Sequence, residues 1–240
     1  MRILWAARVF ADRRRAAGGD LPAAFGLAGR GGYGLRLYCI RHGESTWNAE
    51  RRTQGHADVG LSALGLAQAV AVAQRLASEP IGAVLSSDLR RAVETAGPIA
   101  AAHRIGVTAA PLLRERHLGA FQGLTFDEIT RDFAGDWEEV FRSDGRPPGG
   151  GETRSEVTGR VSVLLAELLA EPPAPAVVLV GHGGSLRALY AALLGMPDAA
   201  AWRFRVDNAS LSIFDIYPEG AIAYILNDTC HLEGQCSPER

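Results

Sequence analysis

An arginine and a histidine stand next to one another at the end of the first apolar run that predicts a strand, where they could act on a phosphoryl group. The run at residues 35–40 predicts a buried strand, and Arg41 and His42 follow it directly. In open α/β sheets, ligands bind outside the carboxyl ends of the strands. A guanidinium group hydrogen-bonds phosphate oxygens, and an imidazole can attack phosphorus. We therefore expect Arg41 and His42 to bind and attack a phosphoryl group.

A second predicted strand ends in the same kind of turn, which makes this expectation more specific. Residues 176–180 form another apolar run, and His182, Gly183 and Gly184 follow shortly after it. Two glycines at this position would let the N-terminus of the next helix approach a phosphate closely. We expect the two histidines to lie at the same edge of one sheet.

Two further stretches carry charged side chains that could complete such a site. Residues 86–91 follow the predicted strand 81–85 and end in Arg91, and residues 114–119 contain Glu115. A carboxyl group could protonate a leaving alkoxide, a role worth about 10²–10⁴ in rate. Two alternatives stay open, because Arg91 could be a charge on a helix surface and Glu115 could pair with neighbouring arginines.

The composition describes an ordinary globular protein without an evident polymeric partner. The chain has 240 residues, of which 47% are hydrophobic and 22% charged, enough for one large α/β domain. Its formal net charge of −2 gives no sign of affinity for nucleic acid or a membrane surface. All 25 basic residues are arginines, which excludes a P-loop lysine and Schiff-base chemistry. The three cysteines are too few for a disulfide scaffold, so a cytoplasmic location is expected.

The chain divides into an N-terminal extension and one domain. Residues 1–34 contain six arginines and two aspartates and end in a glycine-rich stretch. We expect them to form a basic, flexible extension before a domain at residues 35–240.

Strand-like and helix-like stretches alternate along this domain. Such alternation predicts a mostly parallel sheet between two layers of helices. The predicted strands are 35–40, 81–85, 176–180, 211–216 and 221–226, and the predicted helices are 62–77, 89–102, 185–194 and one that starts after Thr153 and ends near Glu171. Ser62, Thr125 and Thr153 are predicted N-caps, the last two with a capping-box glutamate three residues later.

Three motifs resemble the histidine phosphatase superfamily, also called the phosphoglycerate mutase-like family. They are the octet Arg-His-Gly-Glu-Ser-Thr-Trp-Asn at 41–48, Ser-Ser-Asp-Leu-Arg-Arg-Ala at 86–92 and Gly-His-Gly-Gly-Ser-Leu-Arg-Ala-Leu at 181–189. The resemblance extends from residue 35 to about residue 226. It implies the family's three-layer α/β/α sandwich.

The resemblance also implies roles for individual residues. His42 would be the nucleophile that becomes phosphohistidine. Arg41, Arg91 and His182 would hold the phosphoryl oxygens, and Glu115 would donate the proton. No metal and no cofactor would be needed. The positions expected on the substrate side are Ser45, Asn48, Gln54, Gly55, Gly183 and Gly184.

Two positions and one loop favour the phosphatase branch of the family over the mutase branch. Leu118 stands where mutases carry a tyrosine, and Gly184 stands where they usually carry an asparagine. A lid insertion is expected at about 124–152; it is acidic and lacks the adjacent basic pair of mutases. The acidic lid also argues against a very highly charged substrate. Its Phe133, Trp137 and Phe141 could contact an apolar leaving group, although their spacing favours packing.

We therefore expect an enzyme that hydrolyses a small phosphomonoester, such as an alpha-ribazole phosphatase or a phosphatase of broad specificity. The alternatives are a cofactor-dependent phosphoglycerate mutase and a phosphate-binding module without turnover. The molecule is expected to form a homodimer.

Overall fold

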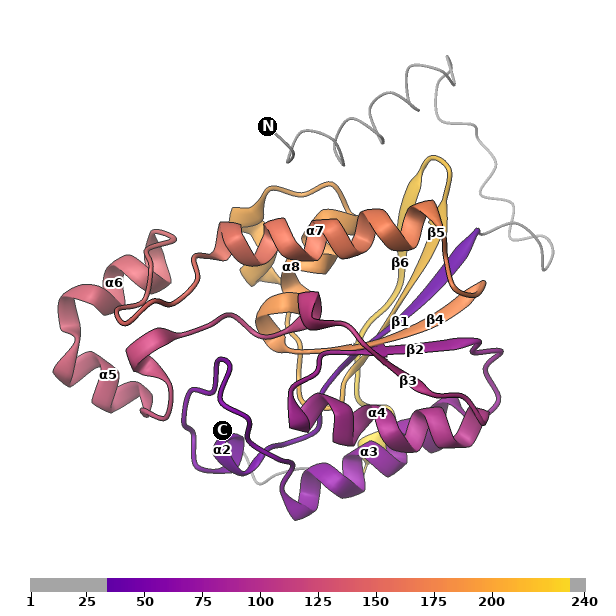
Figure 1. Cartoon of the computed structure of the whole chain (residues 1–240), viewed down its shortest axis with the longest axis horizontal. Coiled ribbons are helices and arrows are strands. Elements are labelled where there is room, and N and C mark those ends of the chain that lie inside the picture. Colours follow the sequence, from indigo (N-terminus) through magenta and orange to yellow (C-terminus); the bar gives the residue numbers. More distant parts are fainter. Residues whose placement is uncertain (1–33, 234–240) are drawn as a thin grey trace.

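The computed structural model describes residues 34–233, so the predicted extension lies, except for Gly34, outside the described residues. Within this range the chain forms one six-stranded sheet in the order β3-β2-β4-β1-β5-β6 (Figure 1). The strands are β1 (Leu35–Arg41), β2 (Ala83–Ser86), β3 (Val107–Ala109), β4 (Ala176–Gly181), β5 (Leu211–Tyr217) and β6 (Gly220–Asp228). The strands β1 to β4 pair in parallel, and β5 runs antiparallel to β1. The predicted mostly parallel sheet is confirmed.

Helices cover both faces of this sheet, as the predicted three-layer architecture requires (Figure 1). Along β1, alternate side chains point to opposite faces. Leu37 and Cys39 belong to the apolar cluster under two of the helices, whereas Tyr38 and Ile40 belong to the cluster under the other two. The first pair of helices is α7 (Arg154–Ala170) and α8 (Gly183–Leu193), and the second is α3 (Ala63–Leu76) and α4 (Arg90–His103).

The central position of β4 explains how the two histidines come together. Every residue of β4 is buried, as expected for a strand inside a parallel sheet. It pairs with β1 in parallel, and Arg41 lies opposite Gly181. The residues that follow, His42 and His182, therefore leave the sheet at the same edge and at the same height.

The predicted helix starts agree with the structure. Ser62 caps α3 by accepting a hydrogen bond from the Gly65 amide at 3.0 Å. Thr125 and Thr153 form capping boxes at the starts of α5 (Phe126–Asp132) and α7. These local interactions are readable from sequence because both partners lie within one turn.

Several elements differ in their bounds from the prediction or were not predicted. Helix α8 begins at Gly183 instead of residue 185, because His182 already acts as its N-cap residue and its amide donates to the Ser185 hydroxyl at 3.1 Å. Strand β3 was not predicted, since it has only three residues and all of them are exposed. The remaining short elements are α2 (Thr46–Ala49), η1 (Pro111–Leu113), η2 (Gly119–Phe121), η3 (Asp198–Arg203) and η4 (Cys230–Leu232).

Helices α5 and α6 (Ala134–Arg142) stand apart from the sheet, in the region predicted as a lid (Figure 1). They have their own apolar cluster, in which Phe121, Ile129 and Val140 are buried. The aromatic residues Phe133, Trp137 and Phe141 pack against this cluster, as their spacing predicted, and Phe141 also lines the cavity described below. None of the helices in residues 34–233 is both long and apolar enough to cross a membrane.

Candidate active site

His42 and His182 lie side by side at the carboxyl ends of β1 and β4. Their ring centroids are 5.0 Å apart, and both side chains are buried. Arg41 and Arg91 line the same cavity as His42, and the charges of both lower the pKa of each imidazole. The four residues predicted to surround the phosphoryl group are therefore brought together.

The hydrogen bonding of His42 leaves one ring nitrogen available for attack. Its Nδ1 lies 2.7 Å from the carbonyl oxygen of Gly43. Because a carbonyl can only accept, Nδ1 carries the hydrogen atom and Nε2 carries a lone pair. Burial, together with the nearby charges of Arg41 and Arg91, lowers the pKa of His42 well below its ordinary value. The imidazole is therefore neutral and nucleophilic near neutral pH.

Arg91 is a fully buried cation of the site, not a surface charge. Its terminal nitrogen atoms donate to the carbonyl oxygens of Ala57 and Gly55, both at 2.8 Å. Its Nε is buried and has no hydrogen-bond partner among the described residues. Burial lowers the pKa of Arg91 to about 10, so the group stays charged. The backbone at Gly55 has a positive φ of 52°, and a Cβ there would collide with Gln122, so glycine is required.

In the ring of His182, one nitrogen forms a hydrogen bond and the other does not. Its Nε2 forms a hydrogen bond of 2.8 Å with the hydroxyl of Ser87, whereas its buried Nδ1 has no partner within residues 34–233. Burial and the charge of Arg91 lower the pKa of His182 well below its ordinary value. A bound phosphoryl group would provide hydrogen-bond partners for both Arg91 and His182.

Glu115 faces the same site and does not pair with its neighbouring arginines. Its carboxyl oxygens accept hydrogen bonds from the amide of Gly184 at 3.0 and 3.1 Å and from the amide of Arg116 at 2.8 Å. Arg114 instead binds Asp88 with two hydrogen bonds of 2.7 and 2.5 Å. A Cβ at Gly184 would collide with the Glu115 carboxyl group, so glycine lets it reach the start of α8.

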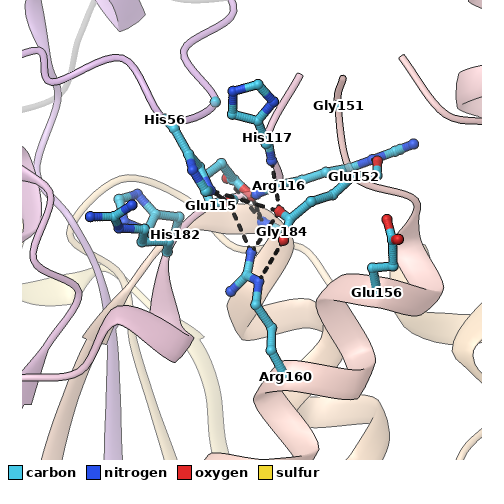
Figure 2. Close-up of polar contacts among 12 residues, drawn as sticks. His56, Glu115, Arg116, His117, Gly151, Glu152, Glu156, Arg160, His182 and Gly184 are labelled. Carbon is cyan, nitrogen blue, oxygen red and sulfur yellow. Dashed lines mark hydrogen bonds and ion pairs between the residues drawn. The ribbon is translucent and has the colours of Figure 1, made fainter. Parts of the chain in front are cut away.

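A polar cluster behind Glu115 holds its backbone in place (Figure 2). The carbonyl oxygen of Glu115 accepts a hydrogen bond from Arg160 at 2.9 Å and lies 2.7 Å from Nε2 of His56. Arg160 also binds the Glu152 carboxylate at 3.0 and 3.1 Å, and this carboxylate accepts from the His117 amide at 2.8 Å. Burial alone would raise the pKa of Glu152, but these hydrogen bonds lower it. The sequence did not single out Arg160 or Glu152.

The residues expected on the substrate side divide into two groups. Asn48, Gln54, Gly55 and Gly184 line a cavity of about 410 Å³ next to His42. Ser45 and Gly183 are buried and do not line it.

Ser45 stabilises the wall of this cavity from behind. Its hydroxyl accepts from the Asn48 amide at 3.0 Å, as the cap of α2, and donates to Gln54 Oε1 at 2.8 Å. The hydroxyl of Ser45 therefore positions two residues that do line the cavity.

Asn208 is a site residue that sequence reasoning missed. Its amide group donates to the carbonyl oxygens of His42 and Gly43 at 3.1 and 3.3 Å and to Asn48 Oδ1 at 3.2 Å. It lies just before β5, whose first residue, Leu211, pairs antiparallel with the last residues of β1. A polar residue ahead of the predicted strand 211–216 was the available signal, because an antiparallel neighbour would bring it to this edge.

The cavity wall is rich in arginine, which corrects the expectation drawn from the acidic lid. Among the described residues that line it, the only carboxylates are Glu115 and Asp198. None of the acidic residues of α5 and α6 lines it. The acidity of the lid therefore does not extend to the cavity. The lining arginines are Arg41, Arg52, Arg91, Arg116, Arg154 and Arg187.

Within residues 34–233 there is no cluster of three or more His, Cys, Asp or Glu that could hold a metal ion.

A neutral buried histidine surrounded by guanidinium groups is typical of enzymes that transfer phosphoryl groups through a nitrogen nucleophile. The sequence profile of the histidine phosphatase superfamily, branch 1, matches residues 37–229. The chain therefore belongs to the histidine phosphatase superfamily, as its motifs predicted.

Relatives in this family include mutase-like proteins and phosphatases. The chain is 37% identical to the probable phosphoglycerate mutase GpmB of Salmonella choleraesuis over an alignment of 214 residues that covers 85% of this chain and 98% of the relative. It is 37% identical to a mycobacterial glucosyl-3-phosphoglycerate phosphatase solved with VO3, with a TM-score of 0.74, covering 81% of this chain and 100% of the other. A putative alpha-ribazole-5'-P phosphatase from Escherichia coli is 30% identical, with a TM-score of 0.76, covering 81% and 97%. The solved relatives thus support phosphatase function.

Proposed function

We propose that this protein is a phosphomonoesterase that hydrolyses a small phosphorylated metabolite through a phosphohistidine intermediate on His42. The observation that carries this proposal is the pairing of a neutral, buried His42, whose Nε2 bears a lone pair, with guanidinium groups in the same cavity. Arg91 Nε has no partner among the described residues, and the guanidinium group of Arg41 lines the same cavity. Cations arranged in advance around a transferred phosphoryl group stabilise the charge on its oxygens.

In the first step, Nε2 of His42 attacks the phosphorus atom. The nitrogen–phosphorus bond forms as the bond to the leaving oxygen breaks, and Arg41, Arg91 and His182 bind the phosphoryl oxygens. The carboxyl group of Glu115 donates a proton to the leaving oxygen, which departs as an alcohol.

In the second step, water completes the reaction. The Glu115 carboxylate takes a proton from a water molecule, whose oxygen attacks the phosphorus atom. The bond to Nε2 then breaks, and His42 returns to its neutral form. Inorganic phosphate leaves, and Glu115 is protonated again for the next cycle.

The cavity has room for an organic leaving group beside the phosphoryl group. A volume of about 410 Å³ lies in the range typical of small-molecule sites. Leu118, Phe141 and Trp202 add apolar surface to its wall. A phosphorylated sugar acid or ribazole, as the names of the solved phosphatase relatives suggest, would be compatible with such a wall.

A rapid-quench experiment tests the proposal. The protein is mixed with a radiolabelled phosphomonoester and quenched in alkali, which preserves phosphohistidine. We expect acid-labile phosphate on His42 followed by release of inorganic phosphate, and neither in the His42→Ala variant. If no phosphomonoester of a broad panel yields phosphoenzyme or phosphate, the protein is a phosphate-binding module.

A phosphoglycerate mutase is the second candidate, because the GpmB relatives are named as such. A mutase returns the phosphoryl group to the organic molecule instead of transferring it to water. Incubation with 3-phosphoglycerate and its bisphosphate primer separates the two functions. We expect release of free phosphate to be the faster reaction. Formation of 2-phosphoglycerate at a higher rate than phosphate release would assign the mutase function.

The same enzyme is proposed to be metal-independent, cytoplasmic and dimeric. Activity should be unchanged after treatment with EDTA, because the proposed steps use only protein groups.

Sedimentation analysis should show twice the mass of one chain. Fractionation of the source cells should place the protein with cytoplasmic markers.

A further inference from the structure

The loop that carries Glu115 has no helix or strand of its own to fix its shape. Residues 114–118 lie between η1 and η2 and belong to neither. For proton transfer, however, the carboxyl group of Glu115 must lie close to the leaving oxygen, and a displacement of about 1 Å can lower a rate by about 10²-fold. Contacts with other elements must therefore hold the polar groups of this loop.

Arg160 of α7 holds the loop from one side. One of its terminal nitrogen atoms donates to the carbonyl oxygen of Leu112 at 2.6 Å, and the other donates to the carbonyl oxygen of Glu115 at 2.9 Å. Its Nε and the second terminal nitrogen donate to the Glu152 carboxylate at 3.0 and 3.1 Å. All three nitrogen atoms are engaged, so the planar guanidinium group fixes where the backbone of Glu115 lies (Figure 2).

Glu152, at the end of the region predicted as a lid, holds the next two residues of the loop. Its carboxylate accepts a hydrogen bond from the His117 amide at 2.8 Å, and its own amide donates to the His117 carbonyl oxygen at 2.8 Å. Its carbonyl oxygen accepts from Nε of Arg116 at 2.6 Å. The Glu152–Arg160 ion pair therefore contacts three successive residues of the loop.

This ion pair differs from those on the molecular surface. The side chains of Arg160 and Glu152 are only 15% and 22% exposed, and the contact between them is bidentate. Exposed pairs contribute little to stability, because solvent and salt screen both charges. Neither side chain lines the cavity beside His42, so any effect of this pair on the reaction must pass through the loop.

We propose that Arg160 and Glu152 are positioning residues for the proton donor, which set the distance between the Glu115 carboxyl group and the leaving oxygen. This inference rests on the proposed function, since it concerns the step in which Glu115 protonates that oxygen. The Glu115 carbonyl oxygen also lies 2.7 Å from Nε2 of His56, so the loop keeps one anchor without the pair. Loss of the pair should therefore displace the Glu115 carboxyl group without releasing the loop.

A series of leaving groups tests the proposal. In Arg160→Gln and in Glu152→Gln, kcat/KM for alkyl phosphates should fall by roughly tenfold or more, because a displaced carboxyl group transfers its proton less efficiently. For 4-nitrophenyl phosphate, whose leaving group needs little protonation, kcat/KM should stay within about threefold. Glu152→Gln keeps an oxygen that can accept from the His117 amide, so it is the milder variant and decides the test if Arg160→Gln does not fold.

Combination with Glu115→Gln shows whether the pair acts through Glu115. Residues that act as one unit have effects that do not add. In a protein that already carries Glu115→Gln, the further change Arg160→Gln should therefore lower kcat/KM for an alkyl phosphate by less than about twofold. The control is Arg142→Gln on α6, the same substitution at an exposed side chain that does not line the cavity, and it should leave the series unchanged.

Separate outcomes overturn the positioning role and the function. Equal losses of kcat/KM for all leaving groups, or no loss in either variant, would overturn the positioning role while phosphatase activity remains. An undiminished loss in the protein that carries Glu115→Gln would do the same, since the pair would then act without Glu115. Absence of turnover with every substrate in the wild-type protein would instead contradict the proposed function, and with it this inference.

Discussion

At the scale of single residues, three influences keep the His42 ring neutral and leave a lone pair on Nε2. The Gly43 carbonyl oxygen accepts a hydrogen bond from Nδ1. Burial disfavours the protonated ring, and the positive charges of Arg41 and Arg91 disfavour it further. The same cations would hold the phosphoryl group after transfer. One set of charges would therefore both keep the proposed nucleophile neutral and bind the phosphoryl group.

The role of Glu115 as a proton donor can be separated from a structural role. Glu115→Gln keeps an oxygen that can accept from the amides of Gly184 and Arg116, but it has no acidic proton. We expect kcat/KM, which reports formation of the phosphoenzyme, to fall by about 10²–10⁴ for alkyl phosphates, whose leaving groups need protonation, and much less for 4-nitrophenyl phosphate. Steady-state kinetics over a series of leaving groups measures this dependence.

A glutamate of the lid serves as the control for this series. Glu138 is exposed on α6 and does not line the cavity, so Glu138→Gln should leave every rate unchanged. Equal losses of kcat/KM for all leaving groups in Glu115→Gln would exclude the acid role.

At the scale of the elements, the site depends on how strand ends and loops meet at one edge of the sheet. Strands β1 and β4 deliver the two histidines in register. The loop before β5 returns to the same edge and brings Asn208 against the His42 and Gly43 carbonyls. The loop of Glu115 is held from the other side by Arg160 of α7. Each contact joins elements that are distant in sequence.

The contribution of Asn208 as a donor is tested by two substitutions of different chemistry. Asn208→Ala removes the hydrogen bonds, and Asn208→Asp keeps the size but replaces the donor by a negative oxygen. Both should lower kcat by roughly tenfold or more through misplacement of His42, and both should lower the free energy of unfolding by about 1 kcal/mol.

Comparison of the two variants shows whether Asn208 acts through its hydrogen-bond donors or through the shape of its side chain. The aspartate variant should be at least as impaired as the alanine variant, because its carboxylate would face two carbonyl oxygens and Asn48 Oδ1. Wild-type kcat and unfolding free energy in Asn208→Asp would show that only the shape of the side chain matters.

At the scale of the whole molecule, a buried site of neutral histidines makes stability depend on pH. Folding lowers the pKa values of His42 and His182 well below 6.5, and burial also lowers those of His56 and His231. The unfolded chain therefore binds more protons than the folded chain as pH falls through 6.5. The stabilisation is complete above the unfolded pKa and is lost below it.

We expect the free energy of unfolding to fall between pH 7 and pH 5, with a limiting slope of about 1.4 kcal/mol per pH unit for each fully buried neutral histidine. Urea titrations at several pH values measure this slope. His42→Gln removes one titrating group, so its slope should be shallower than that of the wild-type protein. Parallel slopes for the two proteins would mean that His42 is not neutral in the folded state.

The sequence by itself determined the fold class, the order of most elements and the central residues of the candidate site. These depend on local patterns: apolar runs, capping residues within one turn such as Ser62, and a histidine directly after a strand. When two such strands pair in parallel, the residues that follow them, His42 and His182, lie at the same edge of the sheet.

Only the tertiary structure decided which charges face the cavity and which residues support the proposed catalytic groups. Asn208 lies 166 positions from His42, and Arg160 lies 45 positions from Glu115, so no local pattern joins them. The lid is acidic in composition, but its acidic residues on α5 and α6 do not line the cavity, whereas Arg154 and Arg187 do. His42 could be proposed as the nucleophile from the sequence because the strand and the turn that carry it are local patterns, whereas the surroundings of the leaving group arise only when distant helices pack together.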